Sequence, residues 1–219
     1  MTLEVELHKT LCAIDGINPT PLDINYDAGS EHVWSTTNKW TLSLWSENDV
    51  QLTGTKIIDQ VEKLEKELAD DIINGKITTA RPKQLICTDN IITNIGLTES
   101  AKRDTGEVST TLTHNSIGTS STTPTVSDTN LGTEDSGGSY ARQAYATAGQ
   151  RKVFSQTAKY GMLWDDTKVS AVPLSIKESG VHWSVSGSSN IHARVTFTTF
   201  SMSAGDLFVT QINELHQNG

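Results

Sequence analysis

Short runs of threonine, serine and apolar residues, separated by Gly, Pro and Asp-Thr, fill roughly the last hundred residues of this chain. Residues 206–212 (DLFVTQI) alternate apolar and polar side chains, so one face of a strand is buried while the other meets solvent. Such faces pack against each other in sandwiches. The pattern predicts a mainly β protein whose C-terminal domain is an antiparallel β-sandwich with one short helix.

The charge balance excludes several classes of partner. The 219 residues carry a formal net charge of -9, whereas affinity for nucleic acid depends on Lys and Arg neutralising phosphates. The same charge disfavours an anionic membrane surface, and the sequence has no apolar run of about eighteen residues that would form a transmembrane helix. Residues 1–7 are acidic where a signal peptide is basic, so no secretion signal is expected. We therefore expect neither nucleic acid nor a membrane as a partner.

Three regions are predicted along the chain. Residues 1–53 form a small N-terminal β region for attachment, residues 54–80 an amphipathic helix with a linker, and residues 81–219 the sandwich domain. Arg81-Pro82 marks the last boundary, because proline favours an extended connection, and residues 84–88 (QLICT) then resemble a strand.

Strong helix formers occupy residues 56–69, with Thr55 as the expected N-cap and Asn74-Gly75 as the expected end. The apolar positions follow the spacing of a heptad seam and are Ile57, Val61, Leu64 and Leu68. Two interpretations stay open, since an amphipathic helix lying on a sheet shows the same stripe as a short self-associating coiled coil.

Tryptophans are concentrated before this helix, at Trp34, Trp40 and Trp45. Residues 41–46 alternate as a strand does, and residues 36–39 suggest a turn, which together predict a hairpin. The tryptophans are interpreted as core or subunit interface, with a sugar-stacking platform as the alternative. With the helix stripe they form the candidate oligomerisation set: Ile57, Val61, Leu64, Leu68, Trp34, Trp40 and Trp45.

Five segments resemble, in order and spacing, a family of structural proteins from tailed viruses. They are residues 90–102 (NIITNIGLTESAK), 114–134 (HNSIGTSSTTPTVSDTNLGTE), 174–181 (LSIKESGV), 193–197 (ARVTF) and 204–207 (AGDL). Ser120 stands where the family's Gly-Thr-Gly element has its second glycine, and an extra Gly137-Gly138 follows the second segment. The resemblance implies a virion component of a bacteriophage or archaeal virus, either a tail appendage or fibre or a capsid decoration.

The residues of these segments also have a structural interpretation of their own. Asp128 is placed to cap the turn that delivers Leu131 into the core, and Glu178 to accept hydrogen bonds from backbone amides at a bend. Arg194 lies midway along a strand, where it either pairs with Glu134 or Glu178 or stays solvated.

No catalytic or metal-binding motif is found in the sequence. The adjacent Asp165 and Asp166 would face opposite ways in a strand and make a poor carboxylate pair for glycoside hydrolysis. The six histidines lack HxH and HExxH spacing, and there is no GxSxG or phosphate-binding loop. We expect no enzymatic activity, no cofactor and no metal. Cys12 and Cys87 are either buried free thiols or a disulfide.

The predicted function is that of a virion structural protein that self-assembles, with a trimer among the options, and attaches to other virion proteins. It would be made in the host cytoplasm and end in the virion. The alternative is a carbohydrate- or receptor-binding module, in which Trp183, Trp164 or the N-terminal tryptophans would stack on a host surface glycan. A cell-surface adhesin is a third option, disfavoured by the expected lack of a signal peptide.

Overall fold

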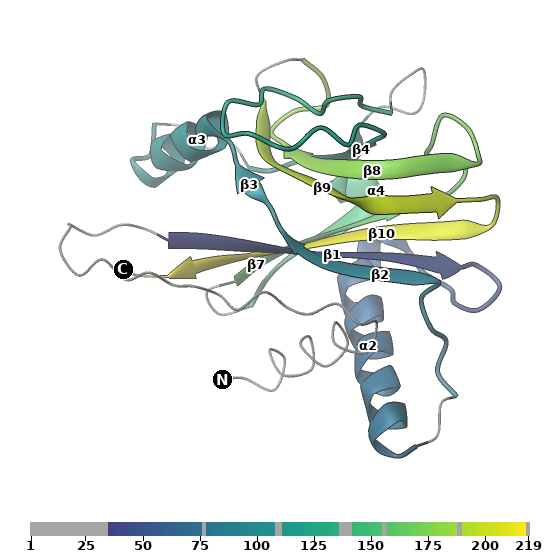
Figure 1. Cartoon of the computed structure of the whole chain (residues 1–219). Coiled ribbons are helices and arrows are strands. Elements are labelled where there is room, and N and C mark those ends of the chain that lie inside the picture. Colours follow the sequence, from purple (N-terminus) through teal and green to yellow (C-terminus); the bar gives the residue numbers. More distant parts are fainter. Residues whose placement is uncertain are drawn as a thin grey trace.

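Two five-stranded antiparallel sheets face each other in the computed structural model, which describes residues 35–75, 78–107, 111–135, 142–154, 157–187 and 190–217 (Figure 1). The first sheet has the strand order β2-β1-β10-β7-β6 and the second β3-β9-β8-β4-β5. The strands are β1 (Ser35–Ser46), β2 (Gln84–Asp89), β3 (Ile91–Ile92), β4 (His114–Gly118), β5 (Gln143–Ala144), β6 (Gly149–Phe154), β7 (Thr157–Trp164), β8 (Leu174–His182), β9 (Ile191–Met202) and β10 (Asp206–Gln217). The helices are a 3-10 turn η1 (Gly54–Lys56), α2 (Ile57–Ile73), α3 (Asn94–Asp104) and α4 (Tyr145–Ala148).

Strand alternation builds the main core between the sheets. In β1, Trp40, Leu42 and Leu44 point inward, and in β10 Phe208 and Ile212 do the same. They meet apolar side chains of the second sheet and its loops, among them Ile117, Ile176, Val181, Val195 and Phe200. The prediction of a mainly β, antiparallel sandwich fold is confirmed.

Strand β1, next to the central strand β10, joins the N-terminal part of the described chain to the sandwich. It lies between β2 and β10, and its register with β10 runs from Ser35↔Gln217 to Ser46↔Asp206. The predicted boundary at residue 53 therefore separates β1 from the strands to which it is hydrogen-bonded. A sequence pattern identifies a strand but not its partner, which here lies at the far end of the chain.

One long strand replaces the predicted tryptophan hairpin. Residues 36–39 were expected to turn, but they belong to β1, which is continuous from Ser35 to Ser46. The strand predicted over residues 41–46 is part of it, and the strand predicted over 84–88 is β2. Trp34 lies outside the described residues.

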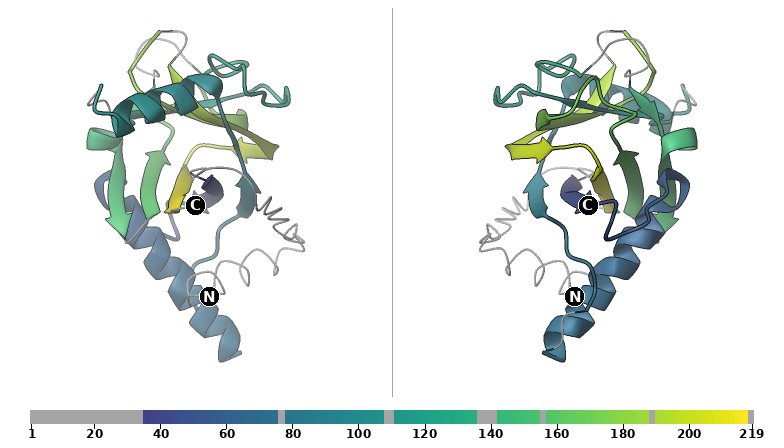
Figure 2. Two further views of the ribbon diagram at one scale, coloured as in Figure 1. Left: turned by 90° about the vertical axis from the view of Figure 1, so that its left-hand side faces the viewer. Right: turned by 90° about the vertical axis from the view of Figure 1, so that its right-hand side faces the viewer.

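Helix α2 packs on the outer face of the first sheet and projects beyond the sheet (Figures 1 and 2). Its Ile57, Ile58 and Val61 join the outward-facing Trp45 and Val209 in a second apolar cluster. This contact confirms an amphipathic helix lying on a sheet. The expected end is also confirmed, because the Asn74 amide bonds Asp70 and Gly75 has φ 66.

The start of the helix differs from the prediction. Thr55 does not cap α2; it lies inside η1, and Thr53 is the residue that precedes that turn. The side chain of Gln60 reaches back to accept a 2.8 Å hydrogen bond from the Thr53 amide. A 3-10 turn placed before an α-helix moves the cap upstream, and spacing alone does not reveal such a turn.

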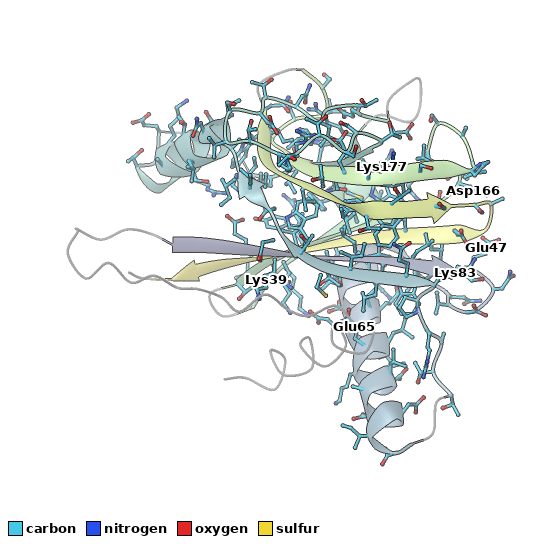
Figure 3. All side chains as sticks on the ribbon, viewed as in Figure 1. Lys39, Glu47, Glu65, Lys83, Asp166 and Lys177 are labelled. Carbon is cyan, nitrogen blue, oxygen red and sulfur yellow. The ribbon has the colours of Figure 1, made fainter. Side chains whose placement is uncertain are left out.

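Three further features concern the cysteines, the helix lengths and the packing between the sheets. Cys87, in β2, is disulfide-bonded, and the chain's other cysteine, Cys12, lies outside the described residues. None of the helices in the described ranges is both long enough and apolar enough to span a bilayer. Side chains fill the space between the two sheets (Figure 3).

Candidate functional site

Residues 119–133 form a long loop without helix or strand, and its two ends lie side by side. Gly118 forms a bridge with Glu134, and the Thr119 amide donates a 3.0 Å hydrogen bond to the Thr133 carbonyl. The loop runs between β4 and the bridge at Glu134, so it leaves and rejoins the second sheet at one place. Loops of this length that lack secondary structure are commonly functional, so this loop is a candidate functional site.

A single buried carboxylate holds both ends of the loop. Glu178, in β8, is 0% exposed and accepts hydrogen bonds from the Ser120 amide at 3.2 Å, the Gly132 amide at 2.9 Å and the Thr133 amide at 2.7 Å. Three amide donors compensate much of the cost of burying the charge. The expectation that Glu178 bonds backbone amides is confirmed.

Arg194, in β9, links that carboxylate to the middle of the loop. Its Nε lies 3.0 Å from Glu178 Oε2, its Nη1 2.6 Å from Asp128 Oδ2, and its Nη2 3.0 Å from the Thr122 carbonyl. The arginine is 2% exposed. Of the three options open from the sequence, the pairing with Glu178 is therefore the one observed.

Asp128 shapes the tip of the loop. It accepts a 3.0 Å hydrogen bond from the Thr125 amide and one of 2.7 Å from the Thr125 hydroxyl, while Leu131 is buried three residues further on. The capping role predicted for Asp128 is confirmed. Partial burial acts to raise the pKa of Asp128, but the bonds from Thr125 and Arg194 outweigh burial and the net pKa is lowered.

A second arginine closes the far end of the loop. Arg142 lies with its Nε 2.8 Å from Glu134 Oε1 and its Nη2 3.0 Å from Glu134 Oε2, a two-pronged pair. It also donates to the side chains of Asn130 and Asn190. Glu134, which the sequence offered as a partner of Arg194, is paired with Arg142 instead.

Gly118 is required at the base of the loop. A Cβ atom there would lie 2.4 Å from the Thr133 carbonyl oxygen and 2.5 Å from Glu178 Oε1, far inside van der Waals contact. Only glycine lets the two ends of the loop and the carboxylate approach this closely.

Helix α3 is fixed to the same end of the second sheet. Thr93 is the N-cap: its hydroxyl accepts from the Gly96 amide at 3.0 Å and donates to the Ile191 carbonyl at 2.6 Å. The Asn94 amide donates to the Val126 carbonyl at 2.7 Å. The loop tip therefore rests on the first turn of α3.

A serine, a histidine and an asparagine lie in a row beneath the loop. Ser116 Oγ is 2.6 Å from His182 Nε2, and His182 Nδ1 is 3.0 Å from Asn190 Oδ1. Burial, followed by the charge of Arg142, lowers the pKa of His182 to about 3 against the bond to Asn190. An imidazole with so low a pKa is a weak general base, and Ser116 is 1% exposed. We interpret the row as a structural hydrogen-bond chain.

Metal binding finds no support in the geometry of the described ranges. No group of three or more His, Cys, Asp or Glu side chains in them is placed to hold a metal ion. The adjacent Asp165 and Asp166 follow β7 in a turn; Asp165 bonds the Thr167 amide at 3.0 Å and pairs with Lys168. This agrees with the turn expected for the two carboxylates.

The candidate oligomerisation residues are placed mainly inside the chain. Trp40, Ile57 and Val61 are 0% exposed and Trp45 is 2% exposed. Leu68 is also buried, and Leu64 is half-buried against the outer cluster. Because these side chains already pack within one copy, they are not available as a contact surface for another. Trp34 lies outside the described residues.

The tryptophans do not form an exposed stacking platform in the described ranges. Trp164, like Trp40 and Trp45, is buried in the core. Trp183 is half-buried, with the guanidinium of Arg103 5.3 Å from its ring centroid and the ring of His192 set edge-on at 5.3 Å. The sugar-stacking alternative therefore gains no support from these residues.

Sequence reasoning missed Arg142, His182 and Asn190. One signal was present: the segments around the loop contain the three carboxylates Asp128, Glu134 and Glu178, and Arg142, shortly after the second segment, was a further cation to consider as their partner. His182 and Asn190 lack any local spacing signal, because their contacts with Ser116 and Arg142 are made across strands.

Comparisons with known proteins gave no relative. Neither a scan against protein-family models nor searches of curated proteins and of solved structures found a match for this chain.

Proposed function

We propose that this protein is a structural component of a tailed-virus particle, a tail appendage or fibre or a capsid decoration, that acts by self-assembly and by attachment to other virion proteins. The observation that carries the proposal is the meeting of four of the five family-like segments. Asn94, the loop 119–133, Glu178 and Arg194 come from four separate segments of the sequence, yet they form one hydrogen-bonded unit.

Such a meeting supports the resemblance because it gives the motif residues a common task. If the likeness were accidental, its polar residues would be expected to scatter over the surface. Instead Glu178 and Arg194 bond the loop, and Asn94 bonds its tip. The fifth segment serves a separate turn, where Gly205 has φ 77 and Asp206 accepts a 2.8 Å bond from the Ser203 amide.

The physical character of the loop suits assembly better than chemistry. Buried ion pairs contribute little net stability, so the use of five charged side chains to hold one loop indicates that the shape of the loop matters. A surface fixed before binding loses less conformational entropy when it docks. Building blocks of particles use such preformed surfaces between identical copies.

Quantitative mass spectrometry of purified particles of the virus that carries this gene tests the location. We expect the chain at a fixed ratio to the major capsid or tail protein, retained after salt washing. Absence from particles, together with presence in the infected cell lysate, would refute the virion assignment.

Light scattering on the purified full-length chain over a hundredfold range of concentration tests self-assembly. We expect a closed oligomer of defined mass. A monomer at every concentration would refute self-association of the isolated chain, while particle attachment would still be judged by the mass spectrometry.

A further inference from the structure

Helix α3 and the tip of the loop together present an uncharged surface. We call it the neutral patch and define it by Leu97, Thr98 and Ala101 of α3 and by Thr125, Val126 and Ser127 of the loop, all exposed. The bond from the Asn94 amide to the Val126 carbonyl sets the two elements side by side. Two large apolar side chains lie in the patch, Leu97 at 51% and Val126 at 52% exposed.

Three of the four charged residues of α3 have a partner within the chain, and the fourth, Asp104, is the last residue of the helix. On α3, Glu99 and Lys102 pair with each other at 2.8 Å, and Arg103 lies over Trp183. Asp128 is the one charged residue among residues 116–133, and it is bound to Arg194. The residues that define the patch carry no charge, whereas the whole chain has a net charge of -9.

Three other large apolar residues are exposed in the described ranges. Val185, at 52% exposed, lies in residues 183–187 (WSVSG), which contain no second exposed large apolar side chain. Val153, at 76% exposed, follows Arg151 and Lys152 in β6, and Ile73, at 79%, follows Asp70 and Asp71 in α2. Charged neighbours make such positions poor centres for an interface, because interface cores are depleted of charge.

We propose that the neutral patch is the contact surface for a second copy of this chain. This inference rests on the proposed self-assembly and names the surface that performs it. Copies with a net charge of -9 repel one another, so contact is least opposed where the charge is absent. Burying Leu97 and Val126 adds apolar contact area, and the clamped loop keeps the ordering cost low.

Four variants of the full-length chain test the surface: the double variant Leu97→Glu with Val126→Glu, the two single variants, and Val153→Glu as the control. The control side chain is more exposed than either patch residue, so a nonspecific effect of glutamate would be at least as large there. Light scattering over a range of concentrations should show the double variant associating at least tenfold more weakly, while the control matches the unmodified protein. Far-UV circular dichroism and thermal midpoints verify that all variants remain folded.

The outcomes separate the two ideas. An unmodified chain that assembles together with an unchanged double variant would overturn the neutral patch and leave self-assembly standing. An unmodified chain that stays monomeric would overturn both. A photo-crosslinking amino acid at position 126 adds a direct readout: a crosslink between two copies supports the proposal, and a crosslink only to a different particle protein overturns it.

Discussion

Arg194 and Glu178 meet across neighbouring strands of the second sheet, with Nη2 of the arginine 2.8 Å from Oε2 of the glutamate and both side chains buried. Because the glutamate also accepts three loop amides, the charge of one residue holds a segment whose ends are more than ten positions apart in sequence. The loop is consequently an extension of the sheet rather than an independent surface feature.

Replacing Glu178 with Gln should release the loop while the sandwich stays folded. The variant leaves the buried Arg194 without its countercharge and presents an amide NH₂ to backbone donors, so we expect a loss of about 3–5 kcal/mol in unfolding free energy. Hydrogen exchange should rise across residues 119–133. Lys177→Gln, on the adjacent half-exposed residue, serves as the control and should change stability by less than about 0.5 kcal/mol. Unchanged loop protection in Glu178→Gln would contradict the clamp.

Acid should weaken the contribution of Asp128. Its folded-state pKa is lowered from the ordinary value of 3.8, so the stability that it contributes is fully present above about pH 4 and is lost as the pH falls through the lowered value. The difference in unfolding free energy between the unmodified chain and Asp128→Asn should therefore be largest near neutral pH and shrink in more acidic buffer. Denaturant titrations at several pH values measure it, and a difference that grows with acid would contradict this assignment.

Because of His182, the protein should become less stable as the pH falls from neutral to mildly acidic. The pKa of His182 is lowered in the folded chain from its ordinary value of 6.5 to about 3, so between these values only the unfolded chain takes up the proton. Stability is then lost as the pH falls below about 6.5, at up to about 1.4 kcal/mol per pH unit through this group. In His182→Gln the slope should be shallower, although the variant is less stable at pH 7.

Ser116→Ala is the matched control for that experiment. It removes the hydroxyl partner of His182 and leaves the titrating imidazole in place, so its slope with pH should resemble that of the unmodified chain. Equal slopes in all three proteins would show that His182 does not titrate as described.

The stripe on α2 should matter for stability and not for association. Ile57→Ala opens a cavity beneath the first sheet and should cost about 2–4 kcal/mol in unfolding free energy. Ile73→Ala, at an exposed position of the same helix, should change it by less than about 0.5 kcal/mol. The mass by light scattering should be equal for both variants in conditions where both are folded. A lower mass for folded Ile57→Ala would restore the helix as an assembly element.

The sequence allowed the local features to be predicted. Alternation identified the strand around residues 41–46, the heptad-like stripe identified α2, and glycine identified its end. The roles of Asp128 and Glu178 were also accessible, because a carboxylate beside a turn or bend has backbone amides within reach.

Pairing across long separations was not accessible. Residues 36–39 were predicted to turn because their side chains are common in turns, yet β10 supplies a partner for that segment and the strand continues through it. Likewise the sequence offered only Arg194 as a partner of Glu134, whereas the fold brings Arg142 to Glu134 and pairs Arg194 with Glu178. These are tertiary choices, which override local preference.

The position of β1 also sets an order of events during synthesis. It emerges from the ribosome early and can pair with β2, but its other edge waits for β10, with which it has its longest register. Until β10 is synthesised, the edge of β1 that will pair with it stays open, and Trp40, Leu42 and Leu44 lack their core partners. An unpaired strand edge beside exposed apolar side chains can pair with strands of other chains. Several nascent copies on one messenger RNA would meet one another in this state. We therefore expect the yield of folded protein in a heterologous host to improve when translation is slowed or a holdase chaperone is supplied.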